Sequence, residues 1–157
     1  MIRIRKATKE DQNTIVEFSL AMARETEDKN LDTHRLMRGV ARVFTSPGKG
    51  LYLIAEVEGT IAGQLLITSE WSDWRNAEFW WIQSVYVHPE FRRRGVYRSL
   101  HNETLKRARE EGNVCGFRLY VHGENSLAQQ AYGRLGMKIS QYMLMECEPP
   151  FTMEGAN

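Results

Sequence analysis

Features that define several protein classes are scarce in this chain of 157 residues. It has only two cysteines, Cys115 and Cys147, which lie far apart and match no metal-ligand spacing, so neither a disulfide framework nor a zinc site is expected. No segment approaches the about 20 consecutive apolar residues that span a bilayer, and residues 1–8 lack the apolar core of a signal peptide. These absences predict a cytoplasmic protein with reduced thiols, no metal and no membrane partner.

An excess of one charge is also lacking over the whole chain, although not locally. The formal net charge is only +1. Residues 92–109 nevertheless hold seven Lys and Arg against Glu103 alone, a local net charge of +6. Nucleic-acid-binding domains usually spread basic residues over a whole face and interleave aromatic residues that stack on bases. Concentrated positive charge in a near-neutral protein instead predicts a small anionic ligand and no nucleic acid.

The order of apolar patterns predicts a single mixed α/β (α+β) domain over residues 1–147, followed by a flexible tail over residues 148–157. Thr8 followed by Asp11 is typical of a helix N-terminus, and Glu58-Gly59 predicts a tight hairpin turn between two antiparallel strands. The expected elements are a strand at 2–5, helices beginning near Thr8 and at 33–44, strands at 51–57, 60–69 and 78–88, a helix at 96–112, a strand at 117–121, a helix at 125–135 and a strand at 137–147.

The most informative stretch runs from Val85 to Leu100, VYVHPEFRRRGVYRSL. A strand pattern leads through a basic turn into a helix, and the first N–H groups of a helix have no partner within it. Gly95 lets the main chain approach an anion closely, and the positive end of the helix dipole lies at the same point. The stretch therefore predicts a phosphate or pyrophosphate site, although an arginine-rich turn can also be simply solvated.

Two motifs make the chain similar to the GNAT superfamily of acyl-CoA-dependent N-acetyltransferases over nearly its full length. In that family a strand ending V-x-P leads to [RQ]-x-x-G-x-[GA] at the start of a helix, and the matching residues here are Val87, Pro89, Arg92, Gly95 and, departing from the pattern, Tyr97. The second motif, N-x-x-A-x-x-x-Y-x-x-x-G-[FM], is matched by Asn125, Ala128, Tyr132, Gly136 and Met137. The resemblance implies a mixed, mostly antiparallel central sheet flanked by helices, in the order β-α-α-β-β-β-α-β-α-β.

The resemblance also implies a site for acetyl-CoA. The backbone of Val85 to Val87 would bind the pantetheine arm, and the turn that follows would hold the pyrophosphate. We expect Tyr97 to crowd this turn, because the family usually has glycine or alanine there. The residues expected to bind acetyl-CoA are Val85, Tyr86, Val87, Arg92, Arg93, Arg94, Gly95, Val96, Tyr97, Arg98, Asn125 and Tyr132.

Acetyl transfer to an amine needs a polarised carbonyl, a proton donor for the thiolate and a neutral nitrogen. The resemblance assigns the donor role to Tyr132, whose ordinary pKa of about 10 is close to that of an alkyl thiol. The alternative is a core tyrosine on an amphipathic helix. The general base is open: the glutamates that some relatives use are absent at the matching positions. His122, which shares a strand face with Tyr120, is a candidate, and a water relay is an equal alternative.

The acceptor is expected to be a small-molecule or peptide amine, with a weak preference for a small amine or polyamine. The residues expected near it are Glu25, Trp71, Trp74, Glu78, Gln83 and Tyr120, because acidic and aromatic side chains attract cationic amines. A different hypothesis keeps the fold without the chemistry, as an acyl-CoA-binding sensor. A homodimer is a further expectation, through the edge of the last strand and its tail.

Overall fold

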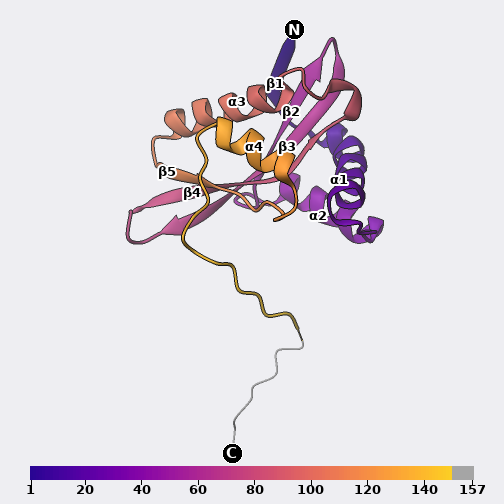
Figure 1. Cartoon of the computed structure of the whole chain (residues 1–157). Helices are drawn as coiled ribbons and strands as arrows, with labels where there is room; N and C mark the ends of the chain where they lie inside the picture. The colour runs from indigo at the N-terminus through magenta and orange to yellow at the C-terminus, as the bar shows by residue number, and fades with distance from the viewer. Residues whose placement is uncertain (150–157) are drawn as a thin grey trace, which may run out of the picture. The chain divides into compact units, whose positions relative to one another are not determined.

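The computed structural model describes residues 1–149, and its centre is a single five-stranded sheet (Figure 1). The strands follow one another across the sheet in chain order. Neighbouring strands are antiparallel from the first to the fourth, and the fifth is parallel to the fourth. The strands are β1 (Ile2–Lys6), β2 (Leu51–Val57), β3 (Thr60–Ser72), β4 (Ala77–Val87) and β5 (Val114–Arg118). This architecture confirms the predicted mixed, mostly antiparallel sheet.

Four α-helices and two short 3-10 turns connect the strands. The helices are α1 (Gln12–Glu27), α2 (Thr33–Thr45), α3 (Val96–Glu111) and α4 (Ser126–Arg134), and the turns are η1 (Lys9–Asp11) and η2 (Pro89–Phe91). The first compact unit of the chain comprises residues 1–125 and therefore holds the whole sheet with α1, α2 and α3. The helix α4 belongs to a second unit that begins at Ser126. In the described residues, no helix is long and apolar enough to cross a membrane.

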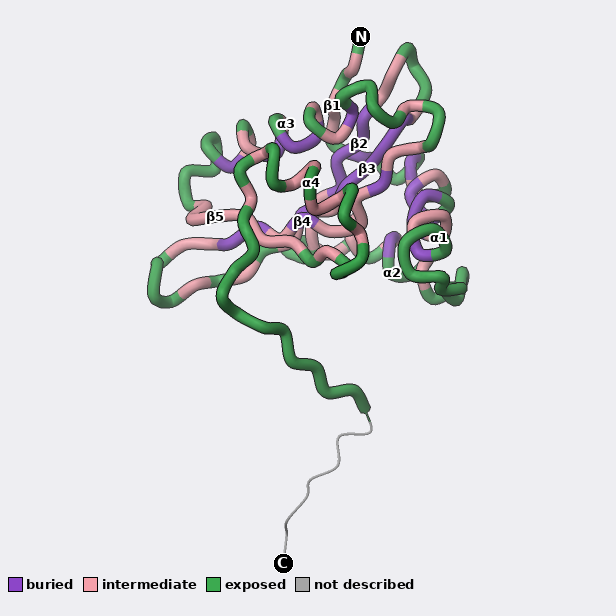
Figure 2. The backbone as a smooth tube through the Cα atoms, in the orientation of Figure 1, coloured by how far each residue is buried: buried purple, intermediate pink, exposed green. Residues whose placement is uncertain are grey.

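The alternation of side chains along β2 divides the core of the first unit into two layers. Tyr52 and Ile54 belong to the apolar cluster that also contains residues of α1 and α2. Leu53 and Ala55 belong to the cluster that contains the buried face of α3. Because successive side chains of a strand point to opposite faces, α1 and α2 cover one face of the sheet and α3 covers the other. Figure 2 shows the buried residues along β2, β3 and the inner sides of these helices.

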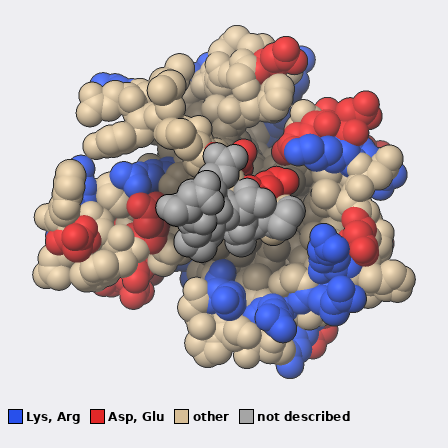
Figure 3. Space-filling model, turned by 90° about the horizontal axis from the view of Figure 1, so that it is seen from below, with Lys and Arg blue, Asp and Glu red and all other residues tan. Residues whose placement is uncertain are grey.

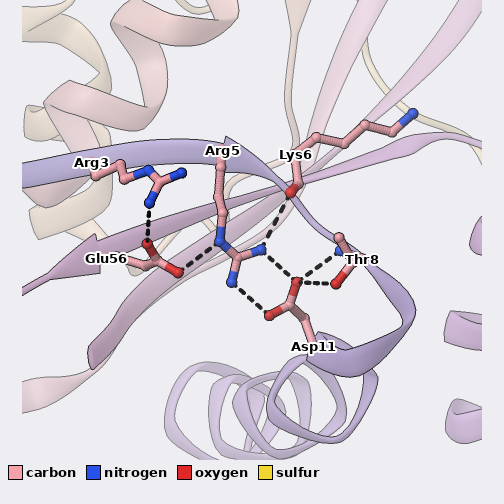
Figure 4. Close-up of polar contacts among 6 residues, drawn as sticks. All are labelled: Arg3, Arg5, Lys6, Thr8, Asp11 and Glu56. Carbon is pink, nitrogen blue, oxygen red and sulfur yellow. Dashed lines mark hydrogen bonds and ion pairs between the residues drawn. The ribbon is translucent and has the colours of Figure 1, made fainter. Parts of the chain in front are cut away.

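An ion-pair network joins the start of α1 to the edge of the sheet (Figure 4). Arg5 on β1 donates to both carboxylate oxygens of Asp11, at 2.6 and 2.8 Å, and to Glu56 on β2 at 2.6 Å. The Asp11 carboxylate also accepts the Thr8 N–H at 2.7 Å. The hydrogen bonds from Arg5 hold the pKa of Asp11 below its usual value. The Thr8 N–H at this helix start thus has a hydrogen-bond partner, as the Thr8 and Asp11 pattern predicts.

Two sequence-based strand boundaries and one predicted strand were wrong, and each error involved pairing between strands. β3 runs on to Ser72, whereas a polar loop was expected from residue 70, because β3 and β4 keep pairing out to Ser72 and Ala77. β5 occupies Val114–Arg118 in place of 117–121, since its ladder with β4 covers only these residues. The strand expected at 137–147 is absent from the described residues: a strand needs a hydrogen-bonded neighbour, and alternating side chains do not supply one.

Nearly all of the expected tail, residues 148–157, lies outside the described residues. The boundaries of the remaining helices and strands agree with the sequence to within a few residues.

Candidate functional site

The sheet opens where β4 and β5 part. Their paired residues end at Trp81 and Arg118, but β4 continues to Val87. Beyond Trp81, the structure pairs β4 only with β3 among the described residues. The backbone of residues 82–87 therefore presents an edge toward the side that β5 leaves, and such an edge can pair with an extended ligand that carries amide groups.

A β-bulge bends β4 within this open segment. Ser84 has a φ of 49°, and two residues of β4, Ser84 and Val85, stand opposite one residue of β3. The neighbouring backbone comes very close here: a Cβ on Gly63 would lie 2.8 Å from the Tyr86 carbonyl oxygen. Buried Gln64 donates to Ser19 on α1 at 3.2 Å. The bulge is thus held by a glycine contact and by α1, and bulges often redirect a strand beside a functional site.

The basic turn leads from the open strand into α3. Gly95 is the N-cap of α3 and has a φ of 83°, a left-handed conformation that only glycine adopts without strain. No side chain caps this helix start, and a Cβ placed on Gly95 would meet nothing within 4 Å. A helix N-terminus whose N-cap residue has no side chain, the open space around it and the exposed side chains of Arg93, Arg94 and Arg98 fit a pyrophosphate.

Arg92, although it belongs to the same turn, is bound to other parts of the fold. Its Nε donates to the Val87 carbonyl oxygen at 2.9 Å, and a terminal nitrogen donates to Glu25 on α1 at 2.6 Å. Its guanidinium also lies 5.6 Å from the centre of the Tyr86 ring. Arg92 therefore fastens the end of β4 to α1, a role that sequence reasoning missed because Glu25 lies 67 residues away.

Glu25 was expected beside the acceptor, and its charge is already balanced. It accepts hydrogen bonds from Arg92 and from the Tyr86 hydroxyl, the latter at 2.8 Å. Burial raises the pKa of Glu25, but the bonds from Arg92 and Tyr86 outweigh it and the net pKa is lowered. Burial, followed by the bond to Glu25, raises the pKa of Tyr86. Both groups keep their neutral-pH charge states as parts of a local clamp.

Tyr97, the departure from the family motif, lies on the first turn of α3. Its ring centre is 6.1 Å from that of His101, one turn further along the helix. Val96, beside it, is buried in the core under α3. Val85 and Val87 pack against the same core, whereas Tyr86 faces α1. The side chains of residues 85–87 therefore pack on the two faces of the sheet, and their backbone groups lie along the edge of β4 that β5 leaves unpaired.

The expected acceptor residues divide between the two faces of the β3–β4 hairpin. Trp71 stands opposite Glu78 and lies, by alternation from Ile67, on the face that α3 covers further along. Gln83 lies on the opposite face and donates to Thr68 at 2.6 Å. Trp74 is in the hairpin turn and is 91 % exposed. The structure thus brings Gln83 and Tyr120 to one face and places Trp71 and Glu78 on the other.

Tyr120 lies two residues beyond the end of β5 and packs on Trp81, with ring centres 4.5 Å apart. Strand alternation places Trp80 and Trp81 on opposite faces of the sheet, but it leaves open which of them belongs to the core. Trp80 is the one buried under α3. His122 is exposed, and its Nδ1 accepts the Glu124 N–H at 3.3 Å. The imidazole is thus bound to the backbone of its own loop at the surface.

The other motif begins at the last residue of the first unit and continues into the second. Asn125 ends the first unit, and Tyr132 lies on α4, which is followed by Gly136 with a left-handed φ of 87°. The N–H groups of Leu135 and Met137 both donate to the Tyr132 carbonyl oxygen, at 3.0 and 3.1 Å. Burial raises the pKa of the Tyr132 hydroxyl. The helix and the glycine after its end agree with the helix predicted at residues 125–135.

Charges of both signs lie near each other on the surface. On the face shown in Figure 3, Lys and Arg side chains lie beside Asp and Glu side chains. Ion pairs account for part of this mixing, as between Arg118 and Glu70 at 2.7 Å and between Lys29 and Glu27 at 2.6 Å. The exposed arginines of the basic turn contrast with this balanced background.

Comparison with known proteins identifies relatives with the same architecture. The model of the acetyltransferase (GNAT) family matches residues 9–137. A protein called a possible acetyltransferase, from Clostridium difficile 630, has a crystal structure with a TM-score of 0.87 and 40 % sequence identity, covering 94 % of this chain and 97 % of that one.

More distant similarities agree. An uncharacterized N-acetyltransferase of Methanocaldococcus jannaschii is 26 % identical over 136 residues, which is 86 % of this chain, and the chain spans 60 % of the length of that relative. A protein called a predicted acetyltransferase, from Clostridium acetobutylicum and solved with acetyl-CoA, has a TM-score of 0.76 at 19 % identity, covering 94 % of this chain and 96 % of that one. At that identity the likeness shows the fold alone.

Proposed function

Because the chain belongs to the acetyltransferase (GNAT) family, we propose that it transfers the acetyl group of acetyl-CoA to a primary amine. One observation carries the proposal: the open edge of β4 leads directly into an exposed basic helix start whose N-cap is Gly95. An extended, amide-bearing chain ending in a pyrophosphate needs these two features next to each other. Acetyl-CoA has that chemistry, and a structural neighbour was solved with it.

The residues proposed to hold acetyl-CoA form two groups. Backbone groups of Val85 to Val87 would bind the pantetheine arm. The first N–H groups of α3, beginning at Val96 and Tyr97, would bind the pyrophosphate with Arg93, Arg94 and Arg98. The Arg92 side chain would support the site indirectly, because its hydrogen bonds to Val87 and Glu25 hold the end of β4 to α1. Asn125 and Tyr132 enter the proposal through the second motif.

The chemistry divides between the bound thioester and the residues of this chain. Acetyl-CoA supplies the acetyl group: the acceptor nitrogen bonds to the carbonyl carbon, the C–S bond breaks and the thiolate takes a proton. A backbone N–H of Val85 or Val87 would donate to the carbonyl oxygen as a preorganised donor. Tyr132 would give the proton to the thiolate, and its raised pKa keeps the phenol protonated at neutral pH.

The acceptor nitrogen must lose a proton to attack, and water is the base that we propose. His122 remains the side-chain candidate, but its Nδ1 already accepts a backbone N–H. The imidazole Nδ1 is then already engaged and cannot also take a proton from the substrate. An unchanged kcat/KM in His122→Gln would support the water relay, and a large loss would assign the base to the imidazole.

A primary amine of low molecular weight is the proposed acceptor. Glu25 and Glu70 are weaker attractants for a polyamine than isolated carboxylates, because each is paired with an arginine. Arg92 lies 2.6 Å from Glu25, and Arg118 lies 2.7 Å from Glu70. Gln83 and Tyr120 remain the expected acceptor residues, and they lie on one face of the sheet near the point where β4 and β5 part. A peptide amine is the alternative acceptor.

Two further expectations belong to the same proposal. Both cysteines are unpaired thiols, which supports a reducing compartment such as the cytoplasm. Pairing of two copies is supported by large apolar side chains that are exposed in the segment after α4, at Ile139, Met143, Leu144 and Met145. An exposed apolar segment of this kind is often an interaction site.

The deciding experiment measures thiol release from acetyl-CoA with a panel of primary amines, comparing the wild type with Tyr132→Phe. We expect thiol release that depends on the amine, and about a 100-fold lower kcat in Tyr132→Phe with a similar KM for acetyl-CoA. Tyr142→Phe is the matched control, because Tyr142 is an exposed tyrosine outside the motif. It should keep wild-type kinetics.

Two results would count against this function. If no amine releases thiol while CoA raises the melting temperature, the chain is an acyl-CoA sensor. That alternative is favoured by Tyr97 in place of a small residue and by the lack of a glutamate base. If Tyr132→Phe turns over at the wild-type rate, the tyrosine is not the acid.

A further inference from the structure

A pair of aromatic rings lies at the point where β4 and β5 part, on the face of the sheet that α1 and α2 cover further along. We call Trp81 and Tyr120 the aromatic platform. Their ring centres are 4.5 Å apart and the planes differ by 31°, an offset arrangement that aromatic pairs favour. Tyr120 is 58 % exposed. Since the indole covers one side of the phenol ring, the exposed part offers its other side to a ligand.

The platform is held in place by a chain of contacts. Trp81 donates its indole N–H to one oxygen of Glu70, and Arg118 donates to the other oxygen at 2.7 Å. The Arg118 guanidinium lies 3.7 Å from the centre of the Phe79 ring. Phe79 in turn lies against Gly116, where an added Cβ would come within 2.9 Å of the ring. The indole is therefore fixed in orientation before any ligand arrives, which lowers the entropic cost of binding.

The charges around the platform cancel. Glu70 is paired with Arg118, and the hairpin turn adds Asp73 and Arg75, so these four residues sum to zero. Glu25, on the same side of the sheet, is paired with Arg92. A polycation gains little from a balanced surface, whereas an aromatic ring stacks on the phenol regardless of the surrounding net charge.

The platform adjoins the proposed reaction site. Tyr120 comes two residues after Arg118, the last residue of β5 that pairs with β4. Gln83 comes two residues after Trp81 on the same face and one residue before the bulge at Ser84. A ligand body resting on Tyr120 therefore lies beside the open edge along which the thioester is proposed to bind.

We propose that the aromatic platform binds the body of the acceptor, and that the preferred acceptor is a monoamine attached to a planar aromatic group. This inference rests on the proposed acetyl transfer and names its substrate class. Tyr120 contacts the substrate, while Glu70 and Arg118 are positioning residues that act through Trp81.

The test compares three amines with the full chain and acetyl-CoA: 2-phenylethylamine, 2-cyclohexylethylamine and spermidine. The first two have the same skeleton and charge but differ in the π system. We expect kcat/KM for the phenyl amine to exceed that for the cyclohexyl amine about threefold to tenfold, the range of an aromatic contact, and to exceed that for spermidine. In Tyr120→Leu the ratio of phenyl to cyclohexyl should fall to about one.

Tyr142→Leu is the matched control, because it removes an exposed tyrosine elsewhere in the chain and should leave the ratio unchanged. For the positioning role, Glu70→Ala should raise the KM for the phenyl amine and leave its kcat and the cyclohexyl amine unaffected. Glu70→Gln should restore the KM, since an amide oxygen still accepts the Trp81 N–H. A purely structural role would change kcat and both amines together.

A binding measurement separates this inference from the proposed function. Saturation-transfer NMR of 2-phenylethylamine with the full chain, without acetyl-CoA, should show contact in the wild type and lose it in Tyr120→Leu. Thiol release with a phenyl to cyclohexyl ratio near one, or with spermidine as the best acceptor, overturns the platform alone. Binding that depends on Tyr120 without thiol release from any amine supports the platform and overturns the transfer.

Discussion

Two arginine-rich regions of the first unit differ in what surrounds their guanidinium groups. Arg5, in the cluster at the start of α1, makes hydrogen bonds to two carboxylates, and Asp11 is 5 % exposed. Arg93, Arg94 and Arg98, at the start of α3, are exposed and stand beside an uncapped helix N-terminus. At the start of α1 the Asp11 carboxylate accepts a backbone N–H, from Thr8. At the start of α3 the N-cap residue is Gly95, which has no side chain to do so.

The comparison shows that a positive charge predicts a ligand site only where the fold has not already supplied its partner. Arg92 makes the point within a single turn, because it lies next to Arg93 in the sequence but is bound to Glu25 and Val87. Charges paired within the fold should affect stability, and unpaired charges should affect ligand binding. The following predictions test that division.

The largest effect is expected at Asp11. Asp11→Asn leaves Arg5 without its main partner in a half-buried position, so the free energy of unfolding should fall by about 3 kcal/mol. The measurement is urea denaturation at neutral pH, together with the KM for acetyl-CoA, which should not change. Glu10→Gln, at the neighbouring exposed position, is the control and should unfold like the wild type. Equal midpoints for Asp11→Asn and the wild type would show that the cluster does not stabilise the fold.

Removal of the exposed arginines should weaken ligand binding and leave the stability of the fold unchanged. The triple variant Arg93→Ala, Arg94→Ala, Arg98→Ala should raise the KM for acetyl-CoA about 10- to 100-fold, the loss of one or two charge-assisted contacts at about 1.5 kcal/mol each. Its melting temperature should stay at the wild-type value. The matched control removes three exposed arginines of α2, Arg35, Arg38 and Arg42. If both triple variants change the KM equally, the basic turn has no special role.

Arg92 should give an intermediate result. Its ion pair with Glu25 joins two side chains that are 44 and 40 % exposed, so Arg92→Ala should lower the free energy of unfolding by only about 0.5–1 kcal/mol. The KM for acetyl-CoA should rise less than in the triple variant. Arg92→Lys keeps the charge and should recover part of the stability. If the KM rises as much as in the triple variant, Arg92 itself contacts the ligand.

The smallest effect concerns His101, which lies on the buried side of α3 and is 3 % exposed. Burial lowers the pKa of this imidazole below its ordinary value of 6.5. The unfolded chain therefore takes up the proton first as the pH falls below about 6.5, and the folded state loses stability in that direction. The loss between pH 7 and pH 6 is at most about 0.7 kcal/mol. Denaturation at both pH values should show a slope that His101→Gln removes; an equal slope in that variant would assign it to another group.

Local sequence patterns predicted most of the fold. Strand alternation on β2, the Glu58-Gly59 turn and the capping pattern at Thr8 and Asp11 are all determined by residues close to one another in the chain. The strand predicted at 137–147 was wrong for the converse reason, because a strand exists only where another strand pairs with it. The same limit explains why β3 was predicted three residues too short.

The candidate site was predictable to a similar degree. The start of α3, with Gly95 in a left-handed conformation, follows from local sequence. The Glu25–Arg92 pair and the Glu70–Trp81–Arg118 contacts join residues 11 to 67 positions apart. No local pattern marks such pairs. Among the acidic residues expected beside the acceptor, Glu25 is the one that the fold pairs with an arginine, Arg92.

The sequence by itself determined the family, the mostly antiparallel sheet and the helix start at Gly95, because each depends on short spacings and backbone preferences. Only the tertiary structure decided which arginines remain open to a ligand, which tryptophan belongs to the core and where β4 and β5 part. These outcomes depend on partners brought together from distant parts of the chain, and the strength of a charge or a ring contact is set by those partners and by the water they exclude.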